Sequence, residues 1–108
     1  MKRGELWIAT GGVYASKPRP ALIIQDDVFE ATESLTVLPL TSTLQDAALL
    51  RIRIAPGGVT GLEVTSDVMI DKLTTIPRRN ARSRIGRLTS PQLLEVDRAL
   101  MVFLGLAR

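Results

Sequence analysis

The sequence KPRPALIIQDD, residues Lys17–Asp27, and the sequence LTVLPLTS, residues Leu35–Ser42, decide the fold of this chain. Each contains an apolar run with the length and composition typical of a β-strand, and each carries polar groups at one end. Pro18 and Pro20 restrict the backbone on both sides of Arg19. A long cation is therefore held at the point where the first strand begins.

Thr41 and Ser42 close the second stretch with two hydroxyl groups. If the two strands pair, the guanidinium of Arg19 and a hydroxyl from this end share one cleft. A guanidinium donates paired hydrogen bonds to phosphate oxygens, and a hydroxyl can donate one more. The two strands therefore predict a cleft suited to an anionic phosphate.

Further strand patterns lie on both sides of this pair. Apolar runs and alternation predict strands over the ranges Glu5–Ala9, Arg19–Gln25, Leu35–Leu40, Leu49–Ile54 and Asp67–Lys72, with a further short strand at Ile85–Leu88. Pro39 predicts a bend or a bulge in its strand. Thr74–Arg84 reads as a basic, solvated loop or turn.

The fourth of these strands alternates cleanly. Leu50, Ile52 and Ile54 are expected to face inward, and Arg51 and Arg53 outward. The two arginines are read as a solvated strand face, with contact to RNA as the alternative.

One helix is predicted, at the C-terminal end of the chain. Ser90 suits the N-cap, Pro91 the first helical position and Gly105 the C-terminal cap. The predicted core stripe of this helix consists of Leu93, Val96, Leu100 and Phe103. Five or six short strands and one terminal helix predict a single, small, mainly β barrel.

Composition excludes several kinds of site. The 108 residues contain no cysteine and no histidine, which rules out disulfides, thiolate metal sites and the most common general base. Asp26 and Asp27 alone are weak support for a carboxylate metal site. No apolar run approaches the ~20 residues that span a bilayer, so we expect a cytoplasmic protein.

Charge is unevenly distributed along the chain, whose formal net charge is +3. The range Lys72–Arg87 is rich in arginine and contains no acidic residue, whereas acidic residues gather after the first decisive stretch. This asymmetry favours an anionic partner on one face. A solvated arginine-rich loop is the alternative.

Five segments follow one another along the chain: RGELWIA, RPALIIQDD, TVLPLTS, DVMIDKLTTI and IGRLTSPQLLEVDRALMVFLGL. Their order, content and spacing closely resemble the MazF/PemK family of toxin endoribonucleases, over roughly residues 2–106. The resemblance implies one toxin domain, residues 1–108, with an SH3-like β-barrel and a C-terminal α-helix. It also implies the toxin of a type II toxin–antitoxin pair, a metal-independent, sequence-selective endoribonuclease acting on single-stranded RNA.

RNA can be cleaved without a metal because its own 2′-hydroxyl can attack the neighbouring phosphate. The enzyme then has to align the attack and stabilise the added negative charge. The resemblance gives these tasks to Arg19 and Thr41, and it matches Asp71 to an acidic position that some members use as a base. Two other interpretations stay open: an ion pair of Arg19 with Asp26 or Asp27, and a Thr41 hydroxyl that satisfies the backbone.

Five further residues are candidates for binding RNA: Lys17, Gln25, Ser42, Lys72 and Arg78. No cofactor or metal ligand is expected. Around Asp71 the chain departs from the family pattern, with Met69, Lys72 and Thr74 at positions where a basic residue, a glutamine and an arginine are frequent. These departures leave the general base and the RNA sequence preference open.

The resemblance also implies partners. We expect a homodimer and an acidic, largely disordered segment of a cognate antitoxin that covers the RNA site, and no membrane association. A toxin that poisons gyrase on the same barrel is disfavoured, because such relatives use a tryptophan near the C-terminus and the single tryptophan here is Trp7. A non-catalytic RNA-binding module is the third possibility.

Overall fold

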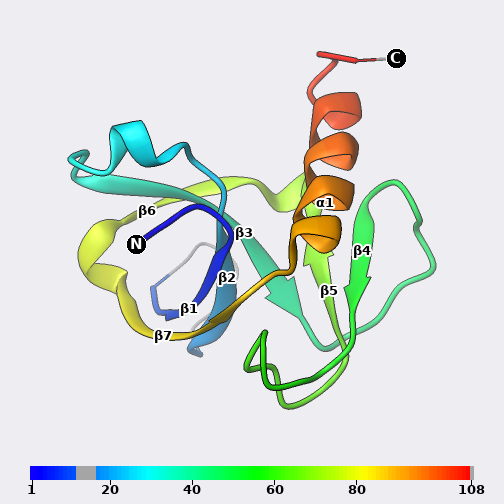
Figure 1. Cartoon of the computed structure of the whole chain (residues 1–108), viewed down its shortest axis with the longest axis horizontal. Coiled ribbons are helices and arrows are strands. Elements are labelled where there is room, and N and C mark those ends of the chain that lie inside the picture. The colour runs from blue at the N-terminus through cyan, green and yellow to red at the C-terminus, as the bar shows by residue number, and fades with distance from the viewer. Residues whose placement is uncertain (12–16, 108) are drawn as a thin grey trace.

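The computed structural model describes residues 1–11 and 17–107, so most of the loop between Gly11 and Pro18 lies outside it. The described chain forms one antiparallel sheet of seven strands and a C-terminal helix (Figure 1). These elements are β1 (Glu5–Ala9), β2 (Arg19–Ile23), β3 (Ser34–Thr41), β4 (Arg51–Ile54), β5 (Ser66–Met69), β6 (Thr74–Pro77), β7 (Ala81–Arg87) and α1 (Ser90–Phe103). Three short 3-10 helices lie between strands: η1 (Asp27–Phe29), η2 (Ile70–Lys72) and η3 (Arg78–Asn80).

Hydrogen bonds join the strands in the order β4-β5-β3-β2-β1-β7, and β6 also pairs with β3. The predicted pairing of the two decisive strands is confirmed, since β2 and β3 run antiparallel with Leu22 opposite Leu38. β4 and β7 end this path, and no strand pairing joins them within the described residues. The mainly β fold with a C-terminal helix is therefore confirmed, but the sheet stays open where a closed barrel was expected.

β3 pairs with three other strands and changes its partner along one edge. One edge of β3 pairs with β2, while the other pairs with β6 from Ser34 to Val37 and then with β5 at Leu40 and Thr41. Pro39 lies between these two pairings and has no N–H to donate to a neighbouring strand. The irregularity predicted at Pro39 takes the form of this change of partner.

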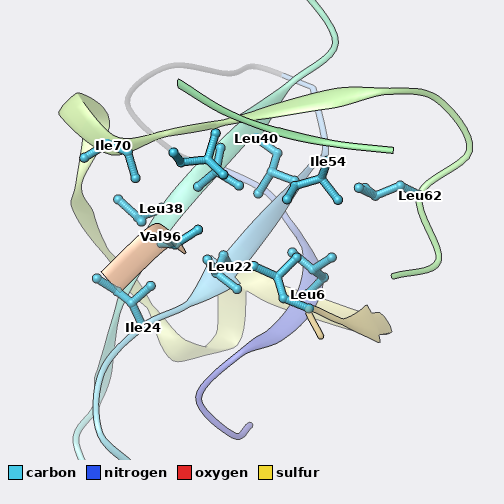
Figure 2. Close-up of a cluster of buried hydrophobic side chains, with 12 residues drawn as sticks. Leu6, Leu22, Ile24, Leu38, Leu40, Ile54, Leu62, Ile70 and Val96 are labelled. Atoms are coloured by element: carbon cyan, nitrogen blue, oxygen red, sulfur yellow. The ribbon is translucent and has the colours of Figure 1, made fainter. Parts of the chain in front are cut away.

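The hydrophobic core covers both faces of β2. Leu22 points into the larger of two clusters, and Ala21 and Ile23 into the smaller one, as a continuous apolar run predicts. Figure 2 shows the larger cluster, with labelled side chains from strands, loops and α1: Leu6, Leu22, Ile24, Leu38, Leu40, Ile54, Leu62, Ile70 and Val96. Each fully buried Leu or Ile stabilises the fold by about 1.5–3 kcal/mol.

α1 forms where it was predicted, with two differences. Thr89 rather than Ser90 is the N-cap, because its side chain accepts from the N–H of Gln92 while the Gln92 side chain accepts from the N–H of Thr89. The prediction that Phe103 belongs to the core stripe is wrong, because 46% of Phe103 is exposed. α1 contacts β4 and η2, and its last turn extends past them. Within the described residues, no helix is long and apolar enough to span a bilayer.

The alternation predicted around β4 is wrong at its first two residues. Leu50 is exposed, because it precedes the strand in a turn whose N–H groups bond to Ala47. The side chain of Arg51 is only 9% exposed and pairs with Asp71. Ile52 and Ile54 are buried as predicted.

The predicted basic loop Thr74–Arg84 is instead β6, η3 and the first half of β7. The predicted strand Ile85–Leu88 is the second half of β7. β6 pairs with β3, and β7 pairs with β1. These two strands are therefore stabilised by backbone hydrogen bonds to distant segments, which the local apolar pattern does not predict.

Candidate active site

An open pocket of about 550 Å³ lies where β2 begins and β3 ends. This volume is within the range of about 300–1,000 Å³ that ligand sites occupy. Ile8, Leu40 and Ile85 form part of its apolar wall, and its polar lining consists of Lys17, Arg19, Thr41, Ser42, Thr43, Glu63 and Ser66. The predicted cleft with a guanidinium and hydroxyls is present, because antiparallel pairing brings the start of β2 beside the end of β3.

Arg19 is exposed at the first position of β2, where its backbone pairs with Ala9 of β1. Within the described part of the chain its side chain makes no hydrogen bond or ion pair. The alternative ion pairs are not formed, because Asp26 caps η1 by accepting from the N–H of Val28 and Asp27 accepts from the N–H of Arg3. The guanidinium is therefore available to an anion in the pocket.

Thr41 ends β3 and is half-buried. Its hydroxyl oxygen accepts from the N–H of Thr43 at 3.1 Å. This contact agrees with the alternative that Thr41 satisfies the backbone, but it uses only the acceptor side of the hydroxyl. The O–H hydrogen remains free to be donated to a ligand oxygen.

A buried carboxylate holds the chain that follows Thr41. Asp67 lies directly opposite Thr41 in the β3–β5 pairing and is fully buried. It accepts from the N–H of Gln45 at 3.0 Å and from Nε of Arg53 at 3.1 Å, and Arg53 also donates to the Gln45 carbonyl. Burial alone would raise the pKa of Asp67, but the hydrogen bonds from Arg53 and Gln45 and the arginine charge outweigh burial and lower it.

This network corrects the prediction that Arg53 belongs to a simple solvated face. Arg53 is half-exposed, yet its guanidinium ties β4 to β5 and to the turn after β3. Sequence reasoning gave Asp67 no role, because only the strand register brings it opposite Thr41.

A loop that docks on β7 completes the pocket. Gly61 has φ +73°, and a Cβ there would lie 1.9 Å from the Ile85 carbonyl oxygen; a Cβ at Gly86 would lie 2.3 Å from the Thr60 carbonyl oxygen. Two glycines thus let the loop and β7 approach backbone to backbone. The contact carries Glu63 to the pocket, and sequence reasoning missed this residue because no local pattern marks it.

The five predicted RNA-binding residues lie in three places, and Lys72 is described below with η2. Lys17 and Ser42 line the pocket with Arg19 and Thr41. Gln25 and Arg78 meet instead at Thr32, whose hydroxyl accepts from both side chains at 3.3 Å.

Thr32 precedes β3, whereas the pocket is at the end of that strand. Because a strand advances about 3.3 Å per residue, the two ends of β3 lie roughly 20 Å apart. Gln25 and Arg78 therefore hold the turn before β3 and are not brought to the pocket.

Asp71 and Lys72 lie in η2 and do not line the pocket. The Asp71 carboxylate pairs with the largely buried guanidinium of Arg51. The structure therefore does not bring Asp71 to Arg19 and Thr41. Among the described residues, no cluster of three or more carboxylate, histidine or cysteine side chains could hold a metal ion.

The sequence of this chain is similar to those of known proteins along nearly its whole length. A family model described as PemK-like, MazF-like toxin of type II toxin–antitoxin system matches residues 2–104. The "Probable endoribonuclease MazF" of Mycolicibacterium smegmatis is 54% identical over 108 residues, covering 99% of each chain. "Endoribonuclease MazF9" of Mycobacterium tuberculosis is 28% identical over 98% of each chain.

Solved structures have the same fold. "Mycobacterium tuberculosis toxin MazF-mt6" superposes with a TM-score of 0.82 at 28% identity, over 96% of this chain and 99% of that one. A mycobacterial "Endoribonuclease in complex with its cognate antitoxin" superposes with a TM-score of 0.80 at 21% identity, over 100% and 98%. The family match spans nearly the whole chain and the fold agrees with it, so this chain belongs to the PemK-like, MazF-like toxins of type II toxin–antitoxin systems.

Proposed function

We propose that this endoribonuclease toxin cleaves single-stranded RNA, including cytoplasmic mRNA, in the pocket between the ends of β2 and β3, without a metal ion. One observation carries the proposal. An exposed arginine without a partner in the described chain and a threonine with a free O–H line one pocket wide enough for a nucleotide.

In the proposed reaction the RNA 2′-oxygen attacks the adjacent phosphorus. The O2′–P bond forms, the P–O5′ bond breaks, and the products carry a 2′,3′-cyclic phosphate and a 5′-hydroxyl. Arg19 donates paired hydrogen bonds to the phosphate oxygens, whose negative charge grows in the transition state. Thr41 donates one more and, held by the N–H of Thr43, does so from a fixed position.

Lys17 and Ser42 are proposed to bind the RNA on either side of the cleaved bond, since both line the same pocket. Sequence selectivity then arises from how the pocket receives the neighbouring bases. The contacts of Gln25 and Arg78 with Thr32, and the position of Lys72 in η2, lend no support to RNA binding by these residues at this pocket.

The side chains present support a metal-free reaction. The chain has no histidine or cysteine, and the carboxylates of Asp67 and Asp71 are each paired with an arginine. The paired state of Asp71 also argues against its predicted role as a base.

The test uses purified protein, a mixed pool of single-stranded RNA and an excess of EDTA. We expect cleavage at a short recurring sequence, with 2′,3′-cyclic phosphate and 5′-hydroxyl ends identified by end-specific ligation and sequencing. Cleavage that requires added Mg²⁺ would refute the metal-free reaction. Binding without cleavage would instead support a non-catalytic RNA-binding module.

Two partners belong to the proposal. Solved structures of relatives include a mycobacterial endoribonuclease in complex with its cognate antitoxin and MazE-MazF from Deinococcus radiodurans. We propose that an acidic, largely disordered antitoxin segment covers the cationic pocket of this chain, and that the chain forms a homodimer.

RNA and the antitoxin segment should therefore compete for the toxin. An acidic peptide from the cognate antitoxin is expected to displace a fluorescent, uncleavable 2′-deoxy oligonucleotide from the protein. Unchanged oligonucleotide affinity at saturating peptide would show that the two sites do not overlap.

A further inference from the structure

The reaction proposed above needs a group that accepts the proton of the attacking 2′-hydroxyl. Arg19 cannot serve, because a guanidinium stays protonated in proteins, and a neutral threonine hydroxyl is a poor base. The chain has no histidine. A lysine accepts a proton only after it has lost one of its own, whereas a carboxylate is ordinarily ionised at neutral pH. A carboxylate in the pocket is therefore the kind of side chain best suited to this task.

Among the described residues, Glu63 is the one carboxylate that lines the pocket. Its side chain is exposed to solvent and makes no hydrogen bond or ion pair within the described residues. It shares the pocket with Lys17, Arg19, Thr41 and Ser42.

Other carboxylates near the sheet are engaged elsewhere. Asp67 and Asp71 are paired with Arg53 and Arg51. Glu5 accepts from Arg84 and from the indole N–H of Trp7 and lies outside the pocket.

Core packing and backbone contacts to β7 fix the position of the backbone around Glu63. Leu62, the preceding residue, is buried in the larger core cluster, and its N–H donates to the Thr60 hydroxyl at 3.2 Å. The N–H of Arg87 in β7 donates to the Val59 carbonyl at 3.0 Å, and Gly61 packs against the backbone of Ile85. A fixed backbone reduces the freedom that Glu63 loses when it engages a substrate.

We infer that Glu63 is the general base that accepts the proton of the attacking 2′-hydroxyl, an inference that rests on the proposed RNA-cleaving function. The proton moves from O2′ to the Glu63 carboxylate as the O2′–P bond forms. As the P–O5′ bond breaks, solvent water protonates O5′ and the carboxyl of Glu63 returns its proton to solvent, so no net proton is consumed. Arg19 and Thr41 hold the phosphate throughout.

The other charged side chains among the described residues that line the pocket are cations. They are Lys17 and Arg19, whereas Arg84 pairs with Glu5 outside the pocket.

The first test compares Glu63→Gln with the parent protein in single-turnover cleavage at saturating enzyme. We expect the cleavage rate to fall by about 100-fold or more, with RNA affinity changed less than about threefold. Glu63→Asp, which keeps the carboxylate, should restore part of the rate.

Two controls make the test specific. Glu33→Gln removes an exposed carboxylate just before β3, at the far end of that strand from the pocket, and should cleave at the parental rate. An RNA with a 5′-bridging sulfur has a leaving group that needs no acid, so Glu63→Gln should remain slow on it if Glu63 is the base. Rescue of the variant by this substrate would assign Glu63 as the acid and overturn the inference.

Each of the remaining outcomes decides between the assignment of Glu63 as the base and another role for it. A weaker affinity with a parental rate at saturation would make Glu63 a binding residue only. If Glu63→Gln cleaves at the parental rate while Arg19→Ala is slow, Glu63 is not the general base. The proposed function would stand in that case. A parent that cleaves no RNA would overturn the proposed function, and the assignment of Glu63 with it.

Discussion

Arg19 and Asp67 are charged residues on strands next to β3, yet the fold gives them opposite surroundings. Arg19 is exposed at a strand start and has no partner within the described residues, whereas Asp67 is fully buried and receives hydrogen bonds from Arg53 and Gln45. An arginine without a partner retains its full capacity to bind an anion, while a buried carboxylate is costly unless it is paired. Arg19 should therefore matter for catalysis and Asp67 for stability.

Replacing Arg19 should slow the chemical step more than it weakens RNA binding. Arg19→Ala is expected to lower the single-turnover rate by about 10²–10³-fold, as does the loss of one preorganised donor. Arg19→Lys should restore the rate only in part, because a point charge does not replace a bidentate fork.

Thr41→Ala should also slow cleavage, and the double variant should lose less than the two single losses combined, since both groups act on one phosphate. Saturating-enzyme kinetics measure both effects. Arg79→Ala, which removes an exposed arginine of η3, is the control and should keep the parental rate. A parental rate for bound Arg19→Ala would reduce Arg19 to a phosphate anchor.

The lowered pKa of Asp67 makes a prediction about stability and pH. Because the folded-state pKa lies below the unfolded one, the ionised carboxylate stabilises the fold at neutral pH, and this contribution is lost as pH falls below about 4. Asp67→Asn should lower the free energy of unfolding by about 1–3 kcal/mol at pH 7, and by less at pH 3. Urea unfolding at both pH values measures the difference.

The control for that series is Glu95→Gln, on the exposed side of α1, which should leave stability nearly unchanged at both pH values. An Asp67→Asn penalty that stays constant from pH 7 to pH 3 would contradict the role given to ionised Asp67.

At the scale of elements, the loop between β4 and β5 acts as a wall of the pocket because it is docked on β7. The docking depends on Gly61 and Gly86, where the two backbones approach too closely for any side chain. It places Leu62 in the core and Glu63 in the pocket. The packing of this loop therefore affects both the stability of the fold and the presence of Glu63 in the pocket.

Gly61→Ala should therefore damage stability and cleavage together. A Cβ at this position meets the Ile85 carbonyl, and the φ of +73° is unfavourable for alanine, so we expect a loss of roughly 1–3 kcal/mol and slower cleavage. Gly58→Ala is the matched control, since open space surrounds that Cβ. Thermal unfolding and cleavage assays should separate the two variants, and equal behaviour would rule out tight docking.

At the scale of the whole molecule, one run of exposed, large apolar residues lies at the end of α1 and just after it. They are Met101, Val102, Phe103, Leu104 and Leu106, and Leu94 is also exposed, about two turns before Met101 in α1. The apolar run Ala21–Ile24 would be a second candidate for an interface, but both of its faces are covered within the single chain. The exposed apolar run at the end of α1 is thus the surface from which we argue a dimer.

We predict a homodimer that uses this part of α1. Light scattering at micromolar concentration should give twice the chain mass, and Met101→Lys should shift the protein toward the monomer. Lys2→Glu, at the opposite end of the chain, should not. A parent protein that is monomeric and still cleaves RNA would refute the prediction.

The sequence by itself determined the elements whose signals are local. The apolar runs of β2 and β3, the proline pair around Arg19 and the caps of α1 act over a few residues, so the cleft holding Arg19 and Thr41 was predictable once the two strands were paired. Tertiary structure alone decided that β6 and the first half of β7 are strands, that Asp71 is paired with Arg51, that Asp67 lies opposite Thr41, and that Glu63 lines the pocket with Arg19. These features depend on strand register and on backbone contacts between distant segments, which no local pattern of residues records.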